Sequence, residues 1–140
     1  MTDGLMIAFL IVIVVVGAGI LFVIAHGRRG GQVLDLERYR TSWLQIERQL
    51  VRGEESSYHL AILNADKLLD QALRQRGLKG TTMGERMKYA RDTWSNANAI
   101  WTAHKLRNRI AHEPNVRVEY DDTRRAMAAY KQALKDVGAI

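Results

Sequence analysis

The segment HKLRNRIAHEPN, from His104 to Asn115, gathers the side chains best suited to acid–base and phosphate chemistry. Imidazole, with a pKa of about 6.5, can transfer protons at cellular pH, and a guanidinium can bind a phosphate through two parallel hydrogen bonds. Arg107 and His112 could therefore cleave RNA without a metal. The histidine would move the proton of a 2′-hydroxyl, and the arginine would stabilise the charged phosphorane.

The spacing of Arg107 and His112 sets a condition on that chemistry. The two residues are five positions apart, so an unbroken helix would point them roughly 140° apart. They converge if the helix loosens near His112, which the nearby Pro114 would favour, or if each acts with residues of a facing chain. A purely structural interpretation is also open, because basic side chains at a helix C-terminus are stabilised by the helix dipole.

A helix from about Ser95 to His112 is predicted to carry these residues, and Pro114 ends it because the residue before a proline avoids the helical region. At about 100° per residue, it has two distinct faces. The core face holds Asn96, Ala99, Ile100, Ala103, Leu106 and Ile110. The second face holds Trp101, His104, Lys105, Asn108 and His112. A tryptophan among polar residues indicates that the second face lines a polar cleft or packs on a second copy, with Trp101 and His104 at the dimer interface.

Apolar residues in steps of three and four predict the other helices of an all-α domain. They cover residues 36–50, a segment through 62–73 that ends near Gly77, a short helix from Thr82, and 120–137, which Gly138 ends. Thr82 and Glu85 form a capping box, and Ser56 or Ser57 is expected to cap the second helix. Short stripes favour a four- to five-helix bundle. Three tyrosines are expected to pack with their hydroxyls in water, namely Tyr58, Tyr120 and Tyr130.

An uncharged stretch precedes the bundle. Residues 5–25 read LMIAFLIVIVVVGAGILFVIA, enough for a helix of about 20 residues to cross a lipid bilayer. The chain starts with MTDG, without the basic start of a cleaved signal peptide. We predict a single-pass anchor over residues 1–26, a flexible basic linker over 27–33 and a bundle over 34–140. Arg28 and Arg29 follow the span, so the domain is expected in the cytoplasm of a bacterium, with the N-terminus outside the inner membrane.

The net charge of +6 favours polyanions or an anionic membrane surface as partners. Two groups of basic residues could guide RNA or form an ordinary solvated surface: Arg117, Arg124 and Arg125, and Arg86, Lys88 and Arg91. The chain has no cysteine, which excludes disulfides and thiolate metal sites. It also lacks the G-x-x-x-x-G-K-[ST] and H-E-x-x-H motifs, and no cofactor or metal is expected.

The stretch RNRIAHEP resembles the signature of the HEPN domain superfamily, an arginine, a polar residue, a short spacer and a histidine. AILNADKLLDQALRQRG is similar to the long earlier helix of that family, and the resemblance covers about residues 55–137. It implies a small helical domain that dimerises with the two motifs facing each other across one cleft. It also implies that Arg107 contacts the phosphate, Asn108 orients it and His112 is the acid–base group. The helical wheel and local charge add substrate-binding candidates: His104, Lys105 and Arg109.

Three functions remain open from the sequence. The first is a membrane-tethered, metal-independent endoribonuclease of the defence or toxin type, acting as a homodimer with a cognate antitoxin or protein partner. The second is a non-catalytic helical adaptor that holds a nucleic acid or a protein at the membrane. The third is nucleotide binding without hydrolysis, which no glycine-rich phosphate loop supports. The anchor and the helix over residues 36–50 extend the short HEPN-like domain, as a cover for the dimer face or as a stalk.

Overall fold

The computed structural model describes the backbone of residues 2–27 and 32–140, and the side chains of residues 4–22 and 32–140. The chain divides into two compact units, Met1–Gly30 and Gly31–Ile140. The described residues form six helices and no strand, which confirms the all-α prediction. Most of the predicted linker over 27–33 falls on residues 28–31, outside the described residues, so its flexibility stays a prediction.

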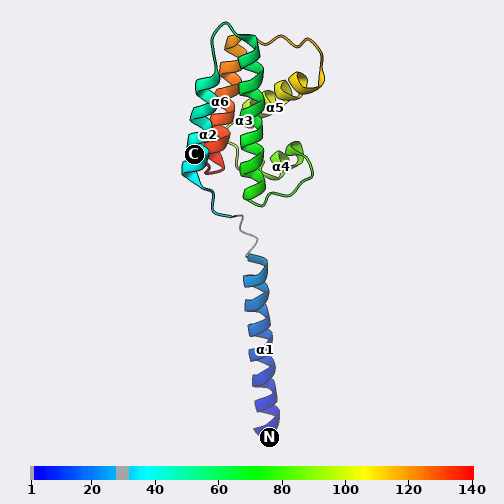
Figure 1. Ribbon diagram of the computed structural model, residues 1–140. Coiled ribbons are helices and arrows are strands. Elements are labelled where there is room, and N and C mark those ends of the chain that lie inside the picture. The colour runs from blue at the N-terminus through cyan, green and yellow to red at the C-terminus, as the bar shows by residue number, and fades with distance from the viewer. Residues whose placement is uncertain (1, 28–31) are drawn as a thin grey trace. The chain divides into compact units, whose positions relative to one another are not determined.

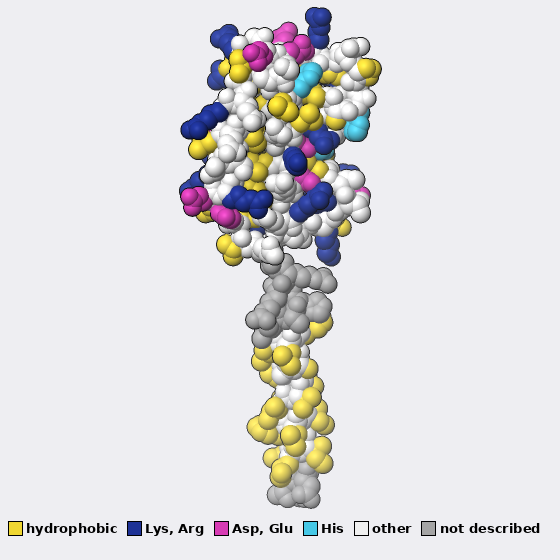
Figure 2. Space-filling view, viewed as in Figure 1, with side chains coloured by type: hydrophobic (Ala, Val, Ile, Leu, Met, Phe, Trp, Pro, Cys, Tyr) yellow, Lys and Arg dark blue, Asp and Glu magenta, His cyan; other side chains and the backbone are white. Residues whose placement is uncertain are grey.

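The first unit contains α1 (Thr2–Gly27). Hydrophobic side chains cover its described surface (Figure 2), and Gly4–Phe22 is long and apolar enough to cross a membrane. A helix of these 19 residues is about 28 Å long, close to the thickness of about 30 Å of a hydrocarbon core. This span lies inside the predicted stretch of residues 5–25, apart from Gly4, and the side chains of residues 23–25 lie outside the described set.

The second unit is a bundle of the five other helices. They are α2 (Leu36–Gln49), α3 (Glu55–Gln75), α4 (Met83–Tyr89), α5 (Ala97–His112) and α6 (Tyr120–Asp136). Helices α2, α3 and α6 lie side by side, and α5 crosses them obliquely (Figure 1). Helix α3 is the centre of the bundle, because it packs on α2, α4, α5 and α6.

The core is built around the apolar stripe of α3. Every helix of the second unit contributes to it, and its fully buried large side chains include Ile62, Leu69, Leu73, Met87, Ile100, Tyr130 and Leu134. Helix α2 adds three buried residues, Tyr39, Trp43 and Ile46. Because burial of large apolar side chains is the main stabilising term in folding, α2 is an integral part of the bundle and not a separate stalk.

Several helix ends follow the predictions. The Thr82 hydroxyl accepts from the Glu85 backbone N–H at 3.2 Å, and the Glu85 carboxylate accepts from the Thr82 N–H at 3.3 Å, which confirms the capping box. A hydrogen bond from the Thr81 hydroxyl, followed by those from the backbone N–H groups of Thr81 and Thr82, lowers the pKa of Glu85. Glu113, before the proline, has extended backbone angles and ends α5.

One predicted helix cap and one predicted core residue are wrong. Glu54 is the N-cap of α3, and the Ser57 hydroxyl instead accepts from the Val51 backbone N–H at 3.0 Å and lies 2.7 Å from the Glu54 carbonyl oxygen. That hydroxyl fastens the turn before the helix. Asn96, assigned to the core face of α5, is exposed and caps the helix, accepting from the Ala99 N–H at 3.1 Å. Position on a helical wheel cannot separate a core residue from a cap in the first turn.

The turn before α4 depends on Gly80. Its φ is +139°, and a Cβ atom there would lie 2.8 Å from Glu85 Cβ and 2.9 Å from the Arg86 backbone nitrogen. We expect Gly80→Ala to reduce the free energy of unfolding by about 2–3 kcal/mol, because strain and a clash with backbone add. Urea denaturation of the full-length protein in detergent micelles measures it.

Gly53 provides the matched control for that substitution. Its φ of +94° is also positive, but a Cβ atom would meet nothing within 4 Å. Gly53→Ala should therefore cost only the backbone strain, about 1–2 kcal/mol. Equal losses for the two variants would contradict the close approach of Glu85 and Arg86 to Gly80.

Candidate functional site

A groove of about 890 Å³ runs between α3, α4 and α5. Six of the seven predicted site residues line it: Trp101, His104, Lys105, Arg107, Asn108 and His112. Helix α3 adds residues that the sequence did not indicate as site residues, including Asp66, Lys67 and Asp70. The structure therefore brings the motif of α5 together with a polar strip of α3.

Asp66 of α3 is the centre of a buried polar network. Its side chain is nearly inaccessible, and the residue is 2% exposed. One carboxylate oxygen, Oδ1, accepts from the Tyr130 hydroxyl at 2.9 Å and contacts His104 Nδ1 at 2.8 Å. The other, Oδ2, lies 3.1 Å from Arg107 Nε in an ion pair without hydrogen-bond geometry. One carboxylate thus joins α3, α5 and α6.

The donors and acceptors of this network determine which ring nitrogen of His104 carries the proton. Arg107 Nη1 donates to Asn108 Oδ1 at 2.9 Å, and an arginine can only donate, so the amide nitrogen of Asn108 faces the other way. That nitrogen lies 3.3 Å from His104 Nε2, which must accept. His104 therefore carries its proton on Nδ1 and donates to Asp66. The four side chains form a closed ring, Asp66–His104–Asn108–Arg107, which we call the polar ring.

Tyr130 supports the polar ring from α6. It is fully buried, which corrects the expectation that its hydroxyl lies in water. Burial, and then the negative charge of Asp66, raise the pKa of Tyr130 well above its usual value. The hydroxyl therefore stays protonated and donates to Asp66.

His104 is more buried than the helical wheel predicts. The wheel places His104 away from the core, but it is 7% exposed because α3 covers this side of α5 and supplies Asp66 as its partner. Trp101 is half-buried and meets the His104 ring edge-on, with centroids 6.1 Å apart. A dimer contact through these two residues stays a prediction.

Arg107 and His112 both line the groove but differ in exposure. Arg107 is half-buried in the polar ring, whereas His112 is exposed in the last position of α5. The helix is regular up to His112, so no break in α5 brings the two side chains together. Arg107 and His112 could therefore act together only if each works with residues of a facing chain, the second of the two routes that the sequence allows.

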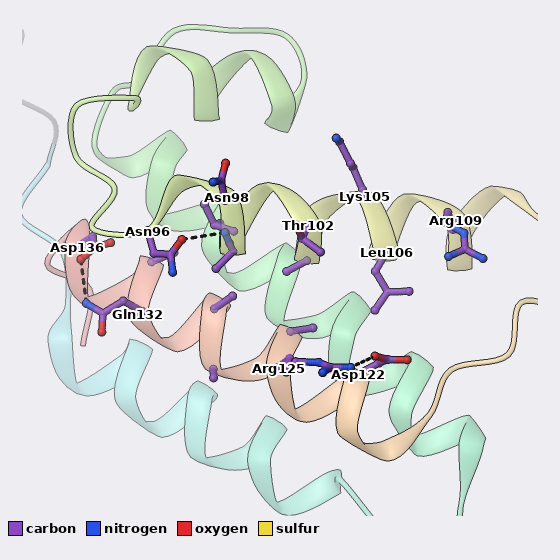
Figure 3. A pocket seen from close by; sticks show the side chains of 17 residues that line it. Asn96, Asn98, Thr102, Lys105, Leu106, Arg109, Asp122, Arg125, Gln132 and Asp136 are labelled. Atoms are coloured by element: carbon purple, nitrogen blue, oxygen red, sulfur yellow. Dashed lines mark hydrogen bonds and ion pairs between the residues drawn. The ribbon is translucent and has the colours of Figure 1, made fainter.

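Arg109 lies elsewhere. It lines a second groove, of about 820 Å³, between α5 and α6, and pairs with Glu113 at 3.5 Å. Figure 3 shows Lys105 and Arg109 toward one end of this groove and Asp136 at the other. Lys105 lines both grooves. Arg109 is therefore separate from the groove that holds Arg107, Asn108 and His112.

The groove of the motif is predominantly basic. Six lysines and arginines line it against three carboxylates, and the basic residues are Lys67, Arg74, Arg86, Lys88, Lys105 and Arg107. Arg86, expected in a surface patch, is instead buried, with Nε 2.8 Å from Asp70 Oδ1 and Nη1 2.6 Å from the Gly80 carbonyl oxygen. It holds α4 to α3. Lys67, Lys88 and Lys105 are exposed and form no ion pair with the residues that the structure describes.

No cluster of three or more metal-binding side chains occurs among the residues described. No protein-family model, curated protein or solved structure matches the chain. The resemblance to the HEPN superfamily therefore depends on the α5 motif and on the order of the helices, and it stays a prediction.

Proposed function

We propose that the protein is a membrane-anchored, metal-independent endoribonuclease of the HEPN type. One observation carries the proposal: Arg107, Asn108 and His112 line a single groove whose charged side chains are mostly basic. A groove lined with lysine and arginine attracts the RNA backbone, and an exposed histidine beside it can exchange protons with the 2′-hydroxyl.

The proposed reaction is an in-line transfer within the RNA strand. The 2′-oxygen attacks phosphorus as His112 takes its proton, and the bond from phosphorus to the 5′-oxygen breaks. The His112 of a facing copy of the chain, which starts protonated, gives its proton to the leaving 5′-oxygen. The products are a 2′,3′-cyclic phosphate and a 5′-hydroxyl. Arg107 stabilises the charge on the phosphorane.

Binding would depend on the other basic residues of the groove. Lys67, Lys88 and Lys105 are exposed there and can contact phosphates without reading sequence. Such binding weakens steeply with added salt. The anchor would hold the domain on the cytoplasmic side of a bacterial inner membrane, as the basic residues after the span indicate. A cognate antitoxin that covers the groove would fit the same proposal.

The test uses full-length protein in lipid nanodiscs, incubated in EDTA with a mixture of single-stranded and structured RNA. We expect wild-type protein to leave 2′,3′-cyclic phosphate ends. His112→Ala should lower the cleavage rate by about 10²–10⁴-fold through loss of acid–base catalysis. Arg107→Ala should lower it by about 10²–10³-fold through loss of charge stabilisation.

Two substitutions outside the groove serve as controls. His59→Ala removes a half-buried histidine of α3, and Arg125→Ala removes an exposed arginine of α6 that pairs with Asp122. Both should cleave at the wild-type rate. Cleavage that survives in His112→Ala would overturn the proposed mechanism.

One observation favours the non-catalytic adaptor as a second candidate. Arg107 is already held by Asp66 and Asn108, so it contributes to joining α5 to α3 without any substrate. The adaptor predicts salt-dependent RNA binding, or binding of an acidic protein, with no cleavage by wild-type protein under any condition. The His112→Ala and Arg107→Ala variants should then fold and self-associate as the wild-type protein does.

A further inference from the structure

Asp66 and His104 border the groove, but their polar atoms are already engaged. Asp66 Oδ1 accepts from Tyr130 and His104, and Oδ2 faces Arg107. His104 Nδ1 donates to Asp66, and Nε2 accepts from Asn108. A phosphate or a ribose hydroxyl would have to break one of these contacts to reach either residue. Neither residue is therefore suited to touch RNA directly.

The same contacts restrain Arg107 and Asn108, the two residues of the polar ring that can touch RNA. Arg107 is restrained at Nε by Asp66 and at Nη1 by Asn108, which leaves Nη2 for a phosphate oxygen. Asn108 is restrained in turn by His104. A free arginine side chain loses rotamer entropy when it is fixed. The polar ring meets that cost on folding, before RNA arrives.

We propose that Asp66 and His104 are positioning residues, which act on RNA only through Arg107 and Asn108. The inference rests on the proposed ribonuclease function. It reassigns His104, which the sequence suggested as a substrate-binding residue. It also gives a role to Asp66, an acid at the centre of an apolar helix face.

Asp66→Asn tests the role with little change of shape. The variant keeps an oxygen for Tyr130 and His104 but turns an amide donor toward Arg107 Nε, so two donors face each other. We expect cleavage to slow by about 100-fold, as for a misplaced catalytic group. The dissociation constant for RNA should change by no more than about twofold, because exposed lysines supply most of the sequence-independent binding.

A double-mutant cycle separates positioning from general damage to the fold. In an Arg107→Ala background, Asp66→Asn has lost the arginine that Asp66 contacts directly and can act only through His104 and Asn108, so it should slow cleavage by much less than about 100-fold. Losses that multiply across the two backgrounds, in proteins of equal melting temperature, would overturn the positioning role. Asp122→Asn removes the same charge from the surface of α6, outside this groove, where Asp122 pairs with Arg125, and it should leave the rate unchanged.

The state of His104 gives a readout that needs no RNA. Nitrogen-15 NMR of histidine-labelled full-length protein in nanodiscs should show the His104 proton on Nδ1, with Nε2 as an acceptor. Asp66→Asn should weaken that preference. A proton on Nε2 in the wild-type protein would overturn the positioning role alone. Wild-type protein that cleaves no RNA would overturn the proposed function, and the positioning role would fall with it.

Discussion

Asp66→Ala is expected to reduce the free energy of unfolding by about 3–5 kcal/mol, the usual cost of removing one partner from a buried charged pair. The substitution leaves the Tyr130 hydroxyl, His104 Nδ1 and Arg107 Nε without the carboxylate that they face. Buried polar groups without partners cost their full desolvation. Denaturant unfolding of the full-length protein, followed by tryptophan fluorescence, measures the loss.

Asp122→Ala is the matched control for that substitution. Asp122 is also an aspartate in an ion pair, with Arg125, but the pair lies on the surface of α6. Its loss should cost no more than about 1 kcal/mol, because water screens exposed pairs. Similar costs for Asp66→Ala and Asp122→Ala would contradict a buried network at Asp66.

The second large effect is expected in α1. Replacing Ile13 and Val14 with lysine places two charges at the centre of the span Gly4–Phe22. Each lysine at the centre of a membrane helix costs roughly 2.5–3.5 kcal/mol on the insertion scale. We expect the double variant to move from the membrane fraction to the soluble fraction of a cell lysate. Carbonate extraction and immunoblotting of both fractions measure the shift.

Met6→Lys provides the comparison for the lysine variant. Met6 is close to the start of the span, where a lysine can extend its ammonium group to the membrane surface. This variant should stay in the membrane fraction. If the double variant stays in the membrane fraction, membrane attachment does not require α1 to cross the hydrocarbon core.

The sequence was sufficient for the helices because their signals are local. The Thr82–Glu85 capping box begins α4, the residue before Pro114 ends α5, and Gly138, with φ +70°, follows α6. Each depends on residues within one turn of the helix end. The start of α3 failed because the Ser57 hydroxyl contacts the preceding turn instead of the first N–H groups of the helix.

The polar ring was not predicted because it joins residues far apart in the sequence. Asp66 and Tyr130 are separated by 64 positions, and their contact depends on how α3 and α6 pack. A signal for Asp66 was nevertheless present. It lies four residues after Ile62 and three before Leu69, within the apolar stripe of α3. An acid at such a position must find partners, and the histidine and arginine of α5 were candidates.

The grooves depend on packing as well. The helical wheel gave the face of α5 that holds Trp101, Lys105, Asn108 and His112, and all four line one groove. It could not show that α3 would bury His104, or that Arg109 would lie toward α6. Arg86 looked like a surface cation because its partner, Asp70, is on another helix. One-dimensional patterns describe the faces of a helix but not which neighbour covers them.

The way the chain enters the bundle decides how a force that pulls on its N-terminal side would spread. The Gln32 backbone N–H donates to the Gln75 carbonyl oxygen at 2.8 Å, and the Tyr39 hydroxyl donates to the Gln75 side chain at 2.9 Å. A pulling force from the N-terminal side reaches these two contacts first and then the packing of α2 on α3. Helix α5 takes part in neither hydrogen bond and packs on α3 and α6. A force pulling on the N-terminal side of this unit would therefore peel away α2 first and leave Arg107 and His112 on an intact part of the bundle.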